Sequence, residues 1–286
     1  GIVMTAFHDS ALAHHAMSAL TLPMAGYVAQ DKLGTSVSLA ETAPSARWLQ
    51  VVNKKPSAFS LSPNQSDNVI YVDECMNYLI HQYGLSSTST GIKSYLLDNE
   101  SALWVSTHPR IHPLQPGIAE HTSKSVALAK TIKDMDSNAK VFGPESYGFA
   151  EYTQYQSALD WSNYSASYPM YVSVFLDSMK KASDIYGKRL LDVFSVHWYP
   201  DVNVGSIYSS DTSLVIAKER MQVPRTLWDS TYVSDSWIGQ WFSANLPILP
   251  YLKSQVNTYY PGTAMGITEY DYGAEEHISG GLAQVD

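Results

Sequence analysis

The 286-residue chain is long enough for one large domain or two small ones, and its 45% hydrophobic and 16% charged residues predict a globular protein with a substantial core. Its formal charge of −9 argues against nucleic acid or an anionic membrane surface as a partner, because both attract basic patches. Cys75 is the single cysteine, which excludes an intrachain disulfide. No apolar run approaches the roughly 18 residues that a membrane-spanning helix needs.

Five short apolar runs have the composition of buried strands, and they cover residues 18–24, 92–97, 139–143, 190–196 and 263–268. Helical periodicity predicts helices between them, at residues 72–83, 118–135, about 172–187, and 238–260 with interruptions at Pro247 and Pro250. The segments 30–68, 104–117, 149–167 and 200–237 are interpreted as loops, and Gly280-Gly281 as a turn. Alternating strands and helices predict an α/β fold with a parallel sheet. Five such units do not close an eight-stranded barrel, so the sheet is either open or part of a barrel.

Acidic residues follow two of the predicted strands directly. The strand 92–97 leads into Asp98-Asn99-Glu100, and the strand 263–268 ends at Glu269. The carboxyl ends of parallel strands meet at one edge of a sheet, where α/β enzymes place catalytic side chains. Glycoside hydrolysis needs one carboxylic acid and one carboxylate, so this pair predicts such a hydrolase. The alternative is that each acid caps the helix that follows it.

Other polar residues at strand ends add to this hypothesis. His197 and Tyr199 alternate at the end of the fourth strand and should point the same way, with Tyr199 donating a hydrogen bond to Glu269. Trp198 should face the core, and a histidine such as His197, taken alone, is more often a buried structural residue. Glu145 ends the third strand and is a rival to either carboxylate. The Asn99 amide could bind a substrate hydroxyl. Alternation of side chains directs Asp98 away from Asn99, which predicts a structural role for Asp98.

His108 and His112 lie four residues apart, a spacing that can bind a metal when both are on one helix face. Pro109 and Pro113 prevent a regular helix there, and no acid lies between the histidines. We therefore expect an ordered loop and no catalytic metal. A metal-dependent hydrolase stays as a third hypothesis.

Several stretches of the chain resemble glycoside hydrolase family 44 endoglucanases, in the same order and at matching spacing. The most specific stretch is Tyr95-Leu-Leu-Asp-Asn-Glu100-Ser-Ala-Leu-Trp104, followed by Thr107-His-Pro-Arg-Ile-His112. The others are residues 21–29, 143–149, 196–200 (Val-His-Trp-Tyr-Pro), 227–229, 267–273 and 278–283. The resemblance covers nearly the whole chain.

The resemblance implies a retaining β-1,4-glucanase with a (β/α)8 TIM barrel and a β-sandwich domain. It assigns Glu100 as the acid/base on the fourth barrel strand and Glu269 as the nucleophile on the seventh. The five predicted strands then become strands three to seven, residues 1–286 form a partial catalytic barrel domain, and the sandwich lies outside this sequence. The expected substrate-binding residues are Asn99, Tyr147, His197, Tyr199 and Trp228.

The resemblance further implies a monomeric, secreted enzyme that acts on cellulose-like glucans, xyloglucan or glucomannan. No cofactor is expected to be required, although the sequence is compatible with a structural calcium ion. Two residues depart from the family pattern: Ser101 replaces the usual Pro, and Ser195 replaces the usual Asp. Because strands are missing, the alternative is a fragment that binds glucan without hydrolysing it.

Overall fold

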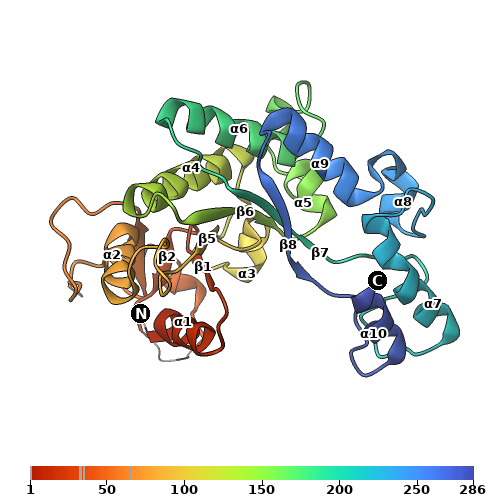
Figure 1. Cartoon of the computed structure of the whole chain (residues 1–286), viewed down its shortest axis with the longest axis horizontal. Helices are drawn as coiled ribbons and strands as arrows, with labels where there is room; N and C mark the ends of the chain where they lie inside the picture. Colours follow the sequence, from red (N-terminus) through yellow and green to blue (C-terminus); the bar gives the residue numbers. More distant parts are fainter. Residues whose placement is uncertain (1, 32–33, 35, 65) are drawn as a thin grey trace.

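The computed structural model describes residues 2–31, 34, 36–64 and 66–286, and its centre is a five-stranded sheet (Figure 1). The strand order is β1-β5-β6-β7-β8, and all neighbouring pairs are parallel. The bounds are β1 Ala19–Leu22, β5 Ser94–Leu97, β6 Lys140–Ser146, β7 Val193–Trp198 and β8 Ala264–Tyr270. The five predicted strands are present, and the predicted parallel sheet is confirmed.

The main helices lie along one face of the sheet and pack on one another in chain order (Figure 1). They are α2 Val72–Tyr83, α4 Ile118–Met135, α6 Tyr171–Tyr186 and α9 Ile248–Tyr259, close to the predicted ranges. Helix α6 ends before Gly187, whose φ of 77° is the left-handed conformation that glycine adopts easily. Pro247 precedes α9 as expected, but Pro250 does not interrupt it, because the first helical turn needs no proline N–H.

The two faces of the sheet differ in exposure. Leu20, Tyr95 and Val141 lie in register across three strands and are all buried. Their neighbours Thr21, Leu96 and Phe142 point to the opposite face, where Thr21 is exposed and the other two are partly buried. The core therefore lies between the sheet and the helices, and within the described residues the second face is only partly covered.

A second sheet, with three strands, lies between the end of β1 and the start of α2. It consists of β2 Tyr27–Ala29, β3 Trp48–Val52 and β4 Val69–Tyr71, with β2 antiparallel and β4 parallel to β3. The prediction that residues 30–68 form one long loop was wrong, because β3 lies inside it. The strand has only five residues, and the surrounding serines and prolines concealed its alternation.

Short helices were also missed in segments interpreted as loops or left unassigned. They are α1 Ile2–Ala13, α3 Trp104–Thr107, α5 Phe149–Gln154, α7 Leu214–Gln222 and α10 Ile278–Val285, whereas α8 Trp237–Trp241 lies at the start of the predicted helical range 238–260. The turn predicted at Gly280-Gly281 was wrong, since both glycines lie in α10. A Cβ on Gly280 would lie 2.3 Å from the Ala274 carbonyl oxygen, so glycine permits a close approach of backbones here. Across the described residues, no helix is long and apolar enough to cross a membrane.

The buried carboxylate of Asp98 joins the segments that follow β1 and β5. It accepts hydrogen bonds from the backbone N–H groups of Met24, Ala25 (3.1 Å) and Asn99 (2.8 Å). Asp98 itself has a positive φ of 62°, which is uncommon for a residue with a side chain. The predicted structural role of Asp98 agrees with these contacts.

We expect Asp98→Ala to lower the free energy of unfolding by about 2–4 kcal/mol, because it leaves three backbone N–H groups without their acceptor. Urea unfolding at neutral pH measures the change. Asp184→Ala is the control, since its exposed ion pair with Lys180 should contribute at most about 0.5 kcal/mol. Equal stability of both variants would contradict a structural role for Asp98.

Candidate active site

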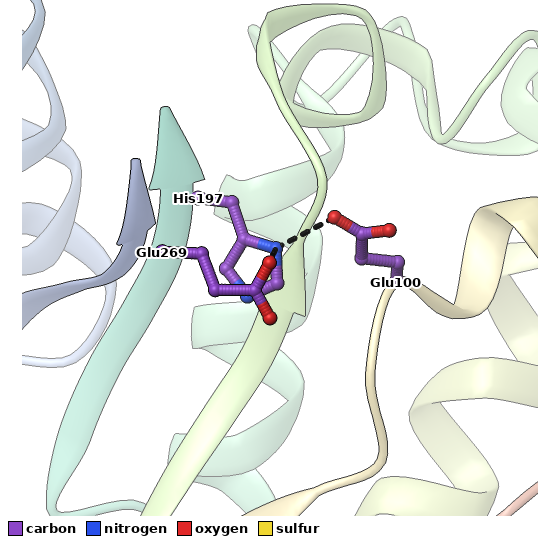
Figure 2. Close-up of side chains that lie close together, drawn as sticks. All are labelled: Glu100, His197 and Glu269. Atoms are coloured by element: carbon purple, nitrogen blue, oxygen red, sulfur yellow. Dashed lines mark hydrogen bonds and ion pairs between the residues drawn. The ribbon is translucent and has the colours of Figure 1, made fainter. Parts of the chain in front are cut away.

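The side chains of Glu100, His197 and Glu269 converge at the carboxyl ends of the strands (Figure 2). The His197 Nδ1 atom lies 2.8 Å from Glu100 Oε1 and 3.5 Å from Glu269 Oε2. One carboxylate oxygen of each glutamate and one ring nitrogen of His197 all lie within 4.8 Å of one another. The structure therefore brings together the two glutamates that the sequence singled out, and places a histidine between them.

Local backbone irregularities aim these side chains. Glu100 lies just after β5 with φ 46° and ψ 49°, a left-handed conformation that is rare outside glycine, and its N–H donates to the Glu145 carbonyl at 3.0 Å. The register between β7 and β8 shifts after Val196, so His197 pairs with Glu269 and Thr268 is the extra residue. Such a bulge redirects side chains at the end of a strand. Strained or irregular backbone is common at functional sites.

A fully buried carboxylate, Glu145, lies beneath His197. It accepts hydrogen bonds from the hydroxyls of Ser195 and Thr268, and its Oε2 lies 3.4 Å from His197 Nε2. Because Glu145 is buried and does not line the cavity above, the expectation that it rivals Glu100 or Glu269 is not supported. Ser195, which replaces the Asp usual in the family, is a hydrogen-bond donor to Glu145.

These contacts keep His197 protonated. Burial alone would lower the pKa of His197, but its hydrogen bonds to Glu100 and Glu145 and the charge of Glu269 raise that pKa to about 9. At neutral pH the ring is therefore a cation that donates from both nitrogens. One positive charge thus lies among three carboxylates.

A cavity of about 540 Å³ opens above the two glutamates. Tyr199 lines it and donates a hydrogen bond to Glu269 Oε2 at 3.0 Å, as expected from the sequence. Burial, followed by this bond, raises the pKa of Tyr199 to about 12, so the hydroxyl stays a donor. Tyr147 also lines the cavity. The remaining lining residues are Leu103, Gly148, Phe149, Ala150, Asp201, Trp237 and Ile238.

Three of the expected substrate-binding residues, Asn99, His197 and Trp228, do not line this cavity. His197 is buried and contacts the two glutamates instead. Asn99 is exposed beside Glu100, and Trp228 is 52% exposed in the segment after α7. Trp237 does line it, although nothing in its sequence context singled it out. Trp198 is buried, as alternation predicted.

Helix α5 supports the site from behind, a role that no pattern in the sequence indicated. The Tyr152 hydroxyl donates to the His197 carbonyl, and the Tyr155 hydroxyl donates to Ser101 Oγ at 2.9 Å. The Glu151 carboxylate accepts the N–H of Tyr147 at 2.9 Å. Burial raises the pKa of Glu151 to about 8, so this carboxyl is neutral at pH 7. Ser101, the second departure from the family pattern, is thus a buried hydrogen-bond acceptor.

The histidines of the 104–117 segment are not arranged as metal ligands. His112 uses both ring nitrogens, on Glu120 Oε1 (2.8 Å) and on the Leu114 carbonyl (2.7 Å), and His108 contacts Thr107. In the described part of the chain, Glu100, His197 and Glu269 are the group whose atoms could hold an ion. Ligation there would require His197 to lose its proton, which its pKa of about 9 disfavours at neutral pH.

Paired carboxylates at the carboxyl ends of parallel strands are the arrangement that glycoside hydrolases use. Comparison with known proteins gives the family. Residues 3–202 match the model of glycoside hydrolase family 44, so the chain belongs to this family. The expected family resemblance is confirmed.

The chain is similar to longer proteins. It is 50% identical over 289 residues to endoglucanase A of Paenibacillus lautus, covering 100% of this chain and 41% of that protein. It is 50% identical over 299 residues to a beta-mannanase/endoglucanase A of Caldicellulosiruptor saccharolyticus, covering 99% of this chain and 22% of that protein. The structure of a Paenibacillus polymyxa xyloglucanase from family 44 superimposes with a TM-score of 0.97 at 51% identity, covering 100% of this chain and 56% of that one. The chain thus spans less than half of the two curated relatives.

We expect Glu145→Gln to lower the pKa of His197 from about 9 towards its ordinary value of 6.5, because one of the raising carboxylates is lost. The raised pKa stabilises the folded state fully below pH 6.5, and this contribution is lost as the pH rises to 9. NMR titration of histidine ring nitrogens, assigned with His197→Asn, measures the shift. An unchanged titration in Glu145→Gln would show that Glu145 does not hold the ring charged.

Glu151→Gln should stabilise the protein at alkaline pH. The folded Glu151 carboxyl holds its proton to about pH 8, whereas the unfolded one loses it near 4.5, so the free energy of unfolding falls between these values. The substituted carboxamide keeps the acceptor for Tyr147 without this cost. We expect no difference at about pH 4 and a gain of a few kcal/mol at about pH 8.5, on the order of 1.4 per pKa unit. Urea unfolding at both pH values measures this difference in stability. Glu276→Gln, at an exposed position, is the control. A gain in stability that does not depend on pH would contradict the raised pKa of Glu151.

Proposed function

We propose that this chain is the larger part of the catalytic domain of a retaining endo-β-1,4-glucanase. The observation that carries the proposal is the pair Glu100 and Glu269, with oxygens within 4.8 Å of each other. Retaining glycosidases separate the two carboxyl groups by about 5–5.5 Å, whereas inverting enzymes need about 6.5–9.5 Å to admit a water molecule. The short separation favours double displacement.

In this mechanism, Glu269 attacks the anomeric carbon and forms a glycosyl-enzyme, while Glu100 protonates the leaving oxygen. Glu100 then removes a proton from the water that releases the sugar. The hydrogen bond from His197 occupies Glu100 Oε1, which leaves Oε2 to carry the proton. Tyr199 occupies Glu269 Oε2, which leaves Oε1 to attack.

During the reaction, the N–H group at His197 Nδ1 has to donate its hydrogen bond to the nucleophile Glu269. An imidazolium donor favours a charged partner, and the nucleophile must be charged whereas the acid must carry a proton. Nδ1 is closer to Glu100 (2.8 Å) than to Glu269 (3.5 Å), so in this structure the donor is on the acid/base residue. A change of less than about 1 Å in these contacts, on substrate binding, would transfer the bond to Glu269.

The five parallel strands would be strands three to seven of a (β/α)8 barrel, with residues 1–286 as part of the catalytic domain. Support comes from the strand order, from helices on one face, and from the partly exposed opposite face, which would be the barrel interior. The accompanying β-sandwich would lie in another part of the polypeptide. A monomeric extracellular enzyme without a required cofactor is part of the same proposal.

The proposed substrates are cellulose-like glucans, xyloglucan or glucomannan. Two curated relatives are named endoglucanases, one of them also a beta-mannanase, and the matching solved structure is a xyloglucanase. The aromatic side chains Tyr147, Phe149, Tyr199 and Trp237 line the cavity, and flat apolar rings with polar tips suit neutral sugars.

The second candidate is a chain that binds glucan without hydrolysing it. One observation favours it: Glu269 lies on β8, which pairs only with β7 among the described strands, and its side chain is 43% exposed. Water can therefore enter from that side. Binding of xyloglucan with no release of reducing ends would support this candidate over the first.

We expect Glu269→Ala to abolish hydrolysis of xyloglucan by this chain, and Glu100→Ala to lower kcat about 10²–10⁴-fold. Glu100→Ala should retain more activity on aryl glycosides with acidic leaving groups, which need no protonation. Azide should rescue Glu269→Ala with formation of an α-glycosyl azide.

The control is Glu276→Ala, an exposed residue outside the cavity, which should keep the activity of the unchanged chain. ¹H NMR of the first products should show the β-anomer if configuration is retained. Full activity in Glu269→Ala, or an α-anomer as the first product, would contradict the mechanism.

A further inference from the structure

The three-stranded sheet carries a second hollow, of about 480 Å³, with Trp48 on its wall. The other residues that line this Trp48 hollow are Tyr27, Gln30, Pro44, Ser45, Ala46, Gln50 and Asn68. None of them is charged. They lie between the carboxyl end of β1 and helix α2, and therefore at the edge of the main sheet that also carries Glu100 and Glu269.

Strand register explains why these side chains share one face. Tyr27 of β2 pairs with Gln50 of β3, and Ala29 pairs with Trp48. Directly opposed residues of an antiparallel pair point to the same face, so two aromatic rings lie diagonally and the small Ala29 faces the indole. The opposite face carries Val51, which packs against the hydrophobic core. The face with Trp48 is the one turned to solvent.

The hollow has one fixed aromatic ring and several unused hydrogen-bonding groups. The Trp48 Nε1 atom donates to the Glu41 carbonyl at 2.7 Å, which fixes the indole ring. In the described structure, no other protein group hydrogen-bonds the side-chain carboxamides of Gln30, Gln50 and Asn68. Each can donate two hydrogen bonds and accept others. The fixed ring needs no ordering when a ligand binds, whereas the three carboxamides are free to turn towards a ligand at some cost in side-chain entropy.

This set of groups matches the chemistry of a neutral sugar ring. A β-linked pyranose has apolar C–H faces and a rim of equatorial hydroxyls that both donate and accept. The aromatic rings can cover the faces, and the carboxamides can bind the rim. The absence of charge among the lining residues that the structure describes disfavours ionic ligands, whose desolvation would not be compensated.

A third hollow adjoins the Trp48 hollow and reaches the segment that follows Glu100. It has a volume of about 400 Å³, shares Trp48 and is also lined by residues 107–111, which follow Glu100 and helix α3. Hydrogen bonds join residues 37–43 to this 107–111 segment. The Ala43 N–H donates to the Arg110 carbonyl (2.7 Å), and Arg110 Nε donates to the Val37 carbonyl (3.0 Å). Leu103, which precedes helix α3, lines the cavity above Glu100.

We propose that the Trp48 hollow is a second glycan-binding site, which holds a distant part of the neutral β-glucan chain that the glutamate pair would cleave. The identity of the glycan rests on the proposed function. The site binds polymer and not short substrates, because it is separated from Glu100 by the whole of the α3 segment.

The test compares polymer binding with turnover of a short substrate. Binding is measured by affinity electrophoresis in soluble xyloglucan with the catalytically inactive Glu269→Gln chain, alone and with Trp48→Ala added. We expect Trp48→Ala to weaken retention about five- to tenfold, the loss expected for one aromatic contact. In the active chain, Trp48→Ala should leave kcat/KM on an aryl cellobioside unchanged and raise KM on xyloglucan.

Two further variants keep the result clear. The double variant Gln30→Ala/Gln50→Ala removes only exposed side chains and should also weaken retention, even if Trp48→Ala disturbs β3. Phe7→Ala is the matched control, an exposed aromatic on α1 that lines none of these hollows, and should change neither quantity. Unchanged retention in both hollow variants, or equal losses on polymer and aryl cellobioside, would overturn the proposal while leaving the proposed function intact. Failure of the proposed function would instead appear as full hydrolysis by Glu269→Ala.

Discussion

The positive charge on His197 is the interaction on which the site depends. Three carboxylates, from Glu100, Glu145 and Glu269, lie within 3.5 Å of its ring nitrogens. Two like charges about 4 Å apart repel by about 4 kcal/mol at an effective dielectric constant of about 20, so three carboxylates could not stay together without a cation or shared protons. The His197 ring lies in contact with all three carboxylates. The Tyr152 hydroxyl holds the His197 backbone by a hydrogen bond to its carbonyl.

The fold makes this arrangement possible by fixing each partner on a different strand of one rigid sheet. Glu145 lies in β6, His197 in β7 and Glu269 in β8, while Glu100 follows β5 in a left-handed backbone conformation. The irregular positions all lie within a few residues of the carboxyl edge. The cost of strained backbone is therefore local, and the buried strands and helices behind it supply the stability that offsets it.

The sequence predicted the parts of the fold and the site that follow short-range rules. The strands and main helices have clear apolar periods, and Glu100 and Glu269 were found because an acid directly follows a strand. The position of His197 and Tyr199 on one side followed from alternation. The partners of Glu145 were not predictable, because Ser195 and Thr268 meet it only through sheet pairing and a bulge.

Loops and short helices set the limit of that prediction. Helix α5 was hidden in an aromatic segment, and with it the roles of Glu151, Tyr152 and Tyr155. Motif matching selected Trp228, which the structure places outside the cavity, and did not select Trp237, which lines it. Both tryptophans lie on or next to loops, whose shape the sequence does not predict.

The two glutamates occupy unequal environments, which agrees with the different roles proposed for them. Glu269 projects from a strand, receives the Tyr199 hydroxyl and has the more exposed side chain, at 43% against 21% for Glu100. Glu100 lies on a turn that its N–H anchors to the Glu145 carbonyl, so the residue beneath His197 also holds the backbone of Glu100. Glu145 is thus connected to Glu100 through the main chain and to Glu269 through Thr268 and His197. A buried residue that does not line the cavity thus contacts the segments that carry both glutamates, and the distance between those glutamates would decide between retention and inversion.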